Sequence, residues 1–397
     1  MGKFSIEKQP TFPLQADPAK QNAVLERHGQ WVRVLQTRAC PCITNGKEEL
    51  FCPVCEGLGF LYSFQRNLRI VEEPHTLHEK NNRIMTDLYP IRNVEKVTKI
   101  LNKIQGGNVN YQIAKFDDKY IEITGANLPL KHEKILVTYE YDRWNNVYNE
   151  HPIVENPYTL HVRECKIDTT LNQNPQEIYG DITEVFRVFN RTKNWNYTVE
   201  HFFKQTILLD KKIPNTPAIE PGDIIEVDYS YCPTLLITSQ SLQSSDNVQQ
   251  KWFNIAVGDV EASFPYQIQL KKGDLVTFLF AEKPVDEIYS KNGADIDVLN
   301  SFDVSKILED IIDAEGKVYK DKIDFFLYDY NKIKWIGNRP APGVKFSVIY
   351  TARPTYVVFD KEPESITSEN KQFPKRAQLR LYQKTKKKEM FIFRGKE

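Results

Sequence analysis

The chain has 397 residues, a length that predicts about two to four domains. Its 53 Lys and Arg residues equal its 53 Asp and Glu residues, and this balance argues against a protein that acts by neutralising phosphates. A hydrophobic content of 41%, with 12% aromatic residues, excludes global disorder. The sequence shows neither an apolar run of about 20 residues nor the apolar centre of a signal peptide, so we expect a soluble chain without a membrane partner.

The first residues predict an extended arm followed by a short helix. Residues 1–16 contain Pro10 and Pro13 and show little apolar periodicity. Asp17-Pro18 is typical of a helix start, with Asp as the capping residue and Pro in the first turn, and the helix is expected to end near Gly29. A strand over Trp31–Leu35 then leads into a group of cysteines.

Four cysteines form the one motif that carries clear chemistry: Cys40, Cys42, Cys52 and Cys55. Two close pairs separated by nine residues can supply the four thiolates of a tetrahedral zinc ion. Because four cysteines would fill the coordination sphere, we predict a closed, structural Zn²⁺ site; free or redox-active thiols are the alternative. Cys165 and Cys232 have no nearby partner in the sequence and are expected to be buried thiols.

From about residue 70 onward, alternating apolar and polar positions predict β-strands arranged as an internal repeat. Each copy has an opening strand, a strand led by an aromatic residue, a third strand and a closing strand. The opening strands are Val94–Val97, Ile182–Val185 and Val285–Ile288; the aromatic-led strands begin at Tyr111, Tyr197 and Phe325; the third strands are Tyr120–Ile123, Thr206–Leu209 and Lys332–Trp335; the closing strands are Ile135–Tyr141, Ile225–Tyr231 and Phe346–Tyr350.

The spacing of the copies predicts one insertion. Val137 and Val227 in the closing strands are 90 residues apart, whereas Val227 and Val348 are 121 residues apart. The additional residues fall within Val298–Gly316, where apolar side chains at helical spacing predict an inserted helix. The alternative is that the similarities are coincidences common in β-rich chains; the agreement of several elements in the same order favours duplication.

We therefore predict a mainly β fold of tandem antiparallel β-sandwich modules, with a small N-terminal helix, a zinc-knuckle region and one inserted helix. The predicted divisions are an N-terminal arm, helix and zinc knob at residues 1–68, β-modules at 69–150, 151–238 and 239–360, and a basic segment at 361–397. The last 27 residues carry a net charge of +8. That segment is either a solvated tail or a contact with an acidic partner or nucleic acid.

No enzyme signature is found in the sequence, and we expect that the chain is not an enzyme. It lacks a nucleophile elbow, a phosphate-binding glycine-rich loop and a dinucleotide fingerprint. The pair His75 and His78, with neighbouring glutamates, lacks the pattern of a metalloprotease helix; it is either a surface turn or a weak metal site.

The cysteine region, read as HGQWVRVLQTRACPC followed by CPVCEGLGFLY, resembles the N-terminal region of structural proteins of tailed bacteriophages. The repeated strands and their Pro-Gly turns are similar to β-modules of phage neck, tail and baseplate proteins. The resemblance implies a virion component, made in the host cytoplasm, that contacts other virion proteins and forms a homo-oligomeric ring or another multi-copy assembly. The Cys-x-x-Cys-x-Gly-x-Gly motif also resembles the zinc region of Hsp40-type chaperones, but the repeated motif and the J domain of that family are missing.

We expect a structural subunit that joins its neighbours in the neck or tail-baseplate region. A binding module for a cell-surface glycan is the alternative, and exposed Trp144, Trp195, Trp252 or Trp335 would favour it. A zinc-ribbon nucleic-acid protein is not favoured, because acidic residues balance the basic residues around the cysteines.

Overall fold

The computed structural model describes residues 29–43, 52, 60–76, 82–99, 109–125, 128–130, 133, 135–167, 178–241, 259–265, 268–361 and 375–382. Within these ranges the chain forms thirty-one β-strands and no helix, and the named strands pair antiparallel. The prediction of a mainly antiparallel β fold is therefore confirmed. The predicted arm and most of the helix that follows it lie outside the described residues, as does the basic run after Tyr382.

Six strands close on themselves and form a central sheet. In ring order they are β1 (Gln30–Ala39), β19 (Leu235–Ser241), β20 (Val260–Phe264), β31 (Lys375–Leu381), β30 (Thr355–Lys361) and β21 (Leu275–Phe278). The ring closes because the first half of β1 pairs with both β19 and β21. The second half of β1 pairs with β2 (Phe60–Ser63). Closure gives each of the six strands a partner on both sides and protects their backbone groups from other chains.

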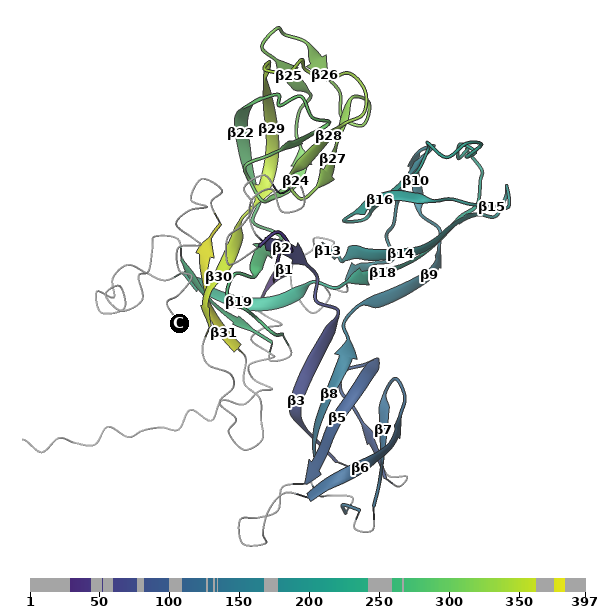
Figure 1. Cartoon of the computed structure of the whole chain (residues 1–397), viewed down its shortest axis with the longest axis vertical. Helices are drawn as coiled ribbons and strands as arrows, with labels where there is room; N and C mark the ends of the chain where they lie inside the picture. Colours follow the sequence, from purple (N-terminus) through teal and green to yellow (C-terminus); the bar gives the residue numbers. More distant parts are fainter. Residues whose placement is uncertain are drawn as a thin grey trace, which may run out of the picture.

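Three groups of strands leave the central sheet in different directions (Figure 1). We call them lobe 1 (residues 67–142), lobe 2 (145–232) and lobe 3 (283–353). Lobes 1 and 2 lie in the chain between β2 and β19, and lobe 3 lies between β21 and β30. The central sheet therefore gathers strands from both ends and the middle of the chain.

The strands of lobe 1 are β3 (Asn67–His75), β4 (Arg83–Met85), β5 (Ile91–Lys99), β6 (Val109–Phe116), β7 (Tyr120–Thr124) and β8 (Ile135–Asp142). Lobe 2 contains β9 (Asn145–Glu150), β10 (Ile153–Asn156), β11 (Thr159–His161), β12 (Lys166–Ile167), β13 (Ile178–Tyr179), β14 (Asp181–Asn190), β15 (Trp195–Asn196), β16 (Val199–Phe203), β17 (Thr206–Leu209) and β18 (Ile225–Cys232). Lobe 3 contains β22 (Lys283–Ser290), β23 (Ile296–Val298), β24 (Asp303–Ile307), β25 (Ile311–Asp313), β26 (Val318–Tyr319), β27 (Phe325–Asp329), β28 (Lys332–Trp335) and β29 (Lys345–Arg353).

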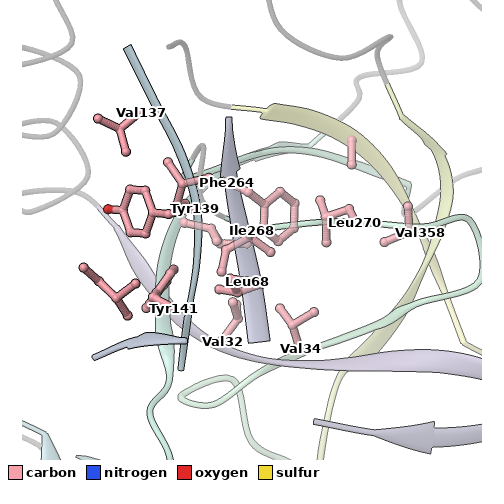
Figure 2. Close-up of a cluster of buried hydrophobic side chains, with 14 of the residues drawn as sticks. Val32, Val34, Leu68, Val137, Tyr139, Tyr141, Phe264, Ile268, Leu270 and Val358 are labelled. Carbon is pink, nitrogen blue, oxygen red and sulfur yellow. The ribbon is translucent and has the colours of Figure 1, made fainter. Parts of the chain in front are cut away.

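The core is continuous between the central sheet and lobe 1. Val32 and Val34 of β1 belong to the same buried cluster as Leu68 of β3 and Tyr139 of β8 (Figure 2). Lobes 2 and 3 each have a separate cluster between two sheets. Their alternating strands place one set of apolar side chains in the core and the other set outside, as expected for sandwich-like packing.

The three lobes share one strand register. In each lobe a middle strand (β8, β18 or β29) pairs with a strand that places a glutamate opposite a valine. A fully buried tyrosine follows two residues after that valine. The valine, glutamate and tyrosine are Val137, Glu73 and Tyr139 in lobe 1, Val227, Glu150 and Tyr229 in lobe 2, and Val348, Glu287 and Tyr350 in lobe 3.

The other side of each middle strand repeats as well. There it pairs with β5, β14 or β24, and the register shifts at the same place in all three lobes. The residue just before the shift is Ile91 in lobe 1, Ile182 in lobe 2 and Val304 in lobe 3. Each pairs with the residue that follows the buried tyrosine by two positions, which is Tyr141, Tyr231 or Ala352. A β-bulge at one position in three sheets indicates a single module built three times.

This register corrects two predictions. The predicted opening strand of the third copy, Val285–Ile288, lies in β22, on the glutamate side; β24 is the true counterpart of β5 and β14. The helix predicted within Val298–Gly316 was wrong, because this stretch forms β23, β24 and β25. Its apolar residues do not share one buried face: Ile311 is fully buried, whereas Ile312 is 47% exposed. As strands, β24 and β25 pair with the backbone of β29, which a helix would leave unpaired.

Candidate metal centre and ionic junction

Three of the four predicted ligands lie together at the end of the hairpin formed by β1 and β2. Cys40 follows β1 directly and is buried, Cys52 is buried, and Cys42 is half-buried. Their sulfur atoms all lie within 4.8 Å of one another, and the Cys40 and Cys52 sulfurs are 3.9 Å apart. Cys55, the fourth predicted ligand, lies outside the described residues.

The sulfur spacing fits a bound metal ion and does not fit a disulfide. A disulfide would bring the two sulfurs to about 2.05 Å. Tetrahedral thiolates at bonds of about 2.3 Å lie about 3.8 Å apart, close to the observed separation of Cys40 and Cys52. The cluster could therefore hold a metal ion without a rearrangement of the backbone.

The strand that leads to the cysteines is held firmly in the central sheet. The backbone amide of Thr37 donates to Asp274 Oδ1 at 2.9 Å, and the Gln36 side chain donates to the Gln269 carbonyl at 3.0 Å. The amide of Ile43 donates to the Cys40 carbonyl at 3.0 Å and forms a tight turn at the first cysteine pair. A metal ion here would close the hairpin loop that joins β1 to β2.

The remaining two cysteines behave as the sequence predicts. Cys165 and Cys232 are both buried, in lobe 2. Burial raises the pKa of the Cys165 thiol to about 12, so this thiol stays protonated at neutral pH.

Beside the metal cluster, the same strand carries a buried ionic junction between the central sheet and two lobes. Arg33 of β1 is 4% exposed and forms ion pairs with Asp181 of lobe 2 and Asp303 of lobe 3. Its second contact with Asp181 measures 3.0 Å between Nη2 and Oδ1. One guanidinium therefore joins three parts of the molecule, using the planar fork for which arginine is suited.

The two aspartates occupy the same place in their lobes, each directly before the residue that precedes the shared bulge. Burial opposes ionisation of Asp303, but the charges of Lys204, Arg33 and Arg353 outweigh it and lower the pKa of this carboxyl. Lys204 Nζ lies 3.3 Å from Asp303 Oδ1 and donates to the Val304 carbonyl at 2.8 Å. The sequence pattern of Asp, then Ile or Val, then Thr or Ser at both sites was the available signal for this junction, and our sequence analysis missed it.

A pocket of about 410 Å³ opens at this junction, with residues from the central sheet and from lobes 2 and 3 along its walls. Arg33, Asp181, Lys204 and Arg353 line it. The wall thus carries both signs of charge. Within it Arg33 pairs with Asp181 and Arg353 pairs with Glu282.

Lobes 2 and 3 also touch directly. The His201 ring stacks on Tyr328 with ring centroids 3.9 Å apart, and its Nε2 lies 2.6 Å from the Tyr328 carbonyl oxygen. Lys334 forms an ion pair with Glu200 at 2.9 Å. These contacts, together with the Arg33 junction, fix the two lobes against each other.

The tryptophans do not form an exposed platform in the described part of the chain. Trp335 is 5% exposed and lies in the core of lobe 3. Trp195 packs against the core of lobe 2, and Trp144 is half-buried beneath Arg66. Trp252 lies outside the described residues.

No protein-family model matches this chain, and no curated protein shows significant similarity to it. Among the described residues, no helix has the length and apolar character needed to cross a membrane.

Proposed function

We propose that this chain is a structural subunit of a tailed-phage particle that joins neighbouring subunits in the neck or tail-baseplate region. The observation that carries the proposal is the arrangement of three equivalent lobes around one closed sheet (Figure 1). Such a body can present the same kind of β-surface to several neighbours at once. Its cores and its buried junction are suited to a rigid connecting role.

An exposed apolar row on lobe 3 is a candidate contact surface. Ile288 and Ile312 both lie opposite Ser347, and Ile312 also lies opposite Val318, so the side chains form one row across the sheet. Ile288 is 72% exposed, and Ile312 and Val318 are 47% and 48% exposed. Apolar side chains gathered on an outer face are typical of surfaces that become buried on association. The proposed partners are further copies of the chain and other virion proteins.

For the cysteine cluster we propose a structural Zn²⁺ ion, with Cys55 as the fourth ligand beside Cys40, Cys42 and Cys52. All-thiolate donor sets favour zinc, and four protein ligands leave no open position for a reaction at the metal. The role of the ion is to hold the hairpin loop on β1, the strand that also carries Arg33.

Electron microscopy of the purified full-length chain at increasing protein concentration tests the proposal. The proposal predicts rings or stacked particles with a constant repeat. It also predicts that Ile288→Asp together with Ile312→Asp disperses them, while Tyr148→Ser on an exposed position of lobe 2 does not. Isolated single particles at every concentration would contradict self-assembly.

A further inference from the structure

Lobe 1 carries a second cluster of side chains that can bind a metal ion, separate from the cysteine cluster. Glu73 and His75 lie at the end of β3, and Asp87 lies in the loop after β4. One donor atom from each lies within 4.8 Å of the other two. Glu73 and His75 are 2% and 9% exposed, whereas Asp87 is exposed, so the cluster opens to solvent on one side. His78, the other histidine noted in the sequence, lies outside the described residues.

Two residues of this cluster, His75 and Asp87, occur in lobe 1 and not at the equivalent positions of lobes 2 and 3. All three lobes contain the pair of a buried tyrosine and a glutamate, but the position of His75, two residues after the glutamate, holds Pro152 in lobe 2 and Tyr289 in lobe 3. Asp87 lies four residues before Ile91, the residue that precedes the register shift in lobe 1. The equivalent positions, four residues before Ile182 and Val304, hold Ile178 in lobe 2 and Asn300 in lobe 3. Lobes 2 and 3 fold without this histidine and this carboxylate, so the module does not require them.

The donor set matches a divalent transition-metal ion. An imidazole nitrogen with two carboxylate oxygens suits Zn²⁺ and its neighbours, whereas Mg²⁺ and Ca²⁺ prefer oxygen donors alone. Donor atoms bound at about 2.1 Å lie about 3–4 Å apart around a tetrahedral ion, which is inside the span of this cluster.

The surroundings of Glu73 also fit a metal ligand. The Tyr139 hydroxyl donates to Glu73 Oε2 at 2.7 Å. His75 Nε2 is hydrogen-bonded to the same oxygen at 2.6 Å, a contact that an ion bound by both residues would replace. A hydrogen bond from a second residue is the usual way in which a ligating carboxylate is oriented. We infer that Glu73, His75 and Asp87 form a second divalent-metal site, which binds Zn²⁺ and ties the end of β3 to the loop after β4.

Native mass spectrometry of the full-length chain, stripped of metal and reloaded with Zn²⁺, tests this site. We expect the variants His75→Gln and Asp87→Asn each to bind one zinc ion fewer than the wild type. The matched control His151→Gln in lobe 2 is expected to keep the wild-type count. Gln can still donate a hydrogen bond to Glu73, and Asp87 is exposed, so both metal-free variants should unfold at the wild-type temperature. In titrations the Kd of the site should rise at least about tenfold.

Cobalt distinguishes this site from the cysteine cluster. Co²⁺ bound by thiolates gives strong charge-transfer absorption in the near ultraviolet, whereas Co²⁺ bound by nitrogen and oxygen does not. We expect the Cys40→Ser, Cys52→Ser variant to bind Co²⁺ without that absorption, and to lose this binding when His75→Gln is added. A zinc count that is equal in wild type, His75→Gln and Asp87→Asn would overturn the inference.

Discussion

The Tyr139 hydroxyl donates a 2.7 Å hydrogen bond to the Glu73 carboxylate inside lobe 1, where both side chains are almost completely buried. The same pair occurs as Tyr229 with Glu150 and as Tyr350 with Glu287. Each tyrosine adds large apolar area to its core, and its hydroxyl satisfies a carboxylate that would otherwise be costly to bury. The pair therefore links the apolar core of each lobe to the register of its middle strand.

Removal of these hydroxyl groups should destabilise the lobes unequally. Tyr139→Phe and Tyr229→Phe should each cost about 1–3 kcal/mol, because a buried carboxylate loses a donor. Tyr350→Phe should cost less, because Glu287 is only half-buried and water can replace the lost donor. Hydrogen exchange of β8, β18 and β29 measures each loss separately, and the exposed Tyr148→Phe serves as control. Equal exchange rates in all four variants would refute a stabilising role for the pair.

Arg33 should be the most sensitive charged residue of the described chain. Arg33→Met leaves Asp181 and Asp303 buried without their shared cation and should lower the free energy of unfolding by about 3–5 kcal/mol. Arg69→Met, which removes an exposed ion pair with Glu95, should cost no more than about 1 kcal/mol. Urea unfolding of both variants makes the comparison. If the two midpoints agree, the junction does not hold the lobes as we describe.

Metal removal should loosen the hairpin without unfolding the lobes. A strong chelator, or Cys52→Ser, should expose residues 40–59 to protease, because the loop loses its only proposed staple. Cys165→Ser, at a buried thiol of lobe 2, should leave both the protease pattern and the thiolate-bound zinc unchanged. Resistance of the loop to protease in the chelated protein would argue against a structural metal at these cysteines.

Acid should weaken the contact between lobes 2 and 3. Burial lowers the pKa of His201 below its ordinary value, so the folded protein holds this ring neutral where an unfolded chain would protonate it. Its contribution to stability is therefore complete above about pH 6.5, the unfolded value, and is lost as the pH falls through the folded pKa.

Thermal unfolding between pH 8 and pH 5 measures this effect. His201→Gln should reduce the loss of stability on acidification, and some slope should remain because burial also lowers the pKa of His161. A wild-type slope in the variant would show that His201 is not the responsible group.

The sequence predicted the elements that depend on local pattern and missed those that depend on distant pairing. The closing strands were predictable because Val227 and Tyr229 alternate with polar residues, and the cysteine cluster was predictable from its spacing. The central sheet was not, because β1 pairs with β19 and β21 more than 200 residues away. The glutamate partners also escaped notice, since the pairs are separated by 66, 79 and 63 residues in the three lobes.

The helix predicted within Val298–Gly316 shows why apolar periodicity alone gave a wrong secondary structure. Apolar residues at 307, 308, 311 and 312 have helical spacing, but Ile307 ends β24, Leu308 lies in the connection, and Ile311 and Ile312 lie on β25. Pairing with β29 decided their structure, and the sequence offers no local sign of that partner.

Native mass spectrometry of the full-length chain over a range of concentrations tests the central claim most directly. We predict discrete oligomers that grow with concentration, each subunit carrying zinc, and their loss in the variant Ile288→Asp, Ile312→Asp. A chain that stays monomeric at every concentration and binds no zinc would contradict both the assembly role and the metal staple.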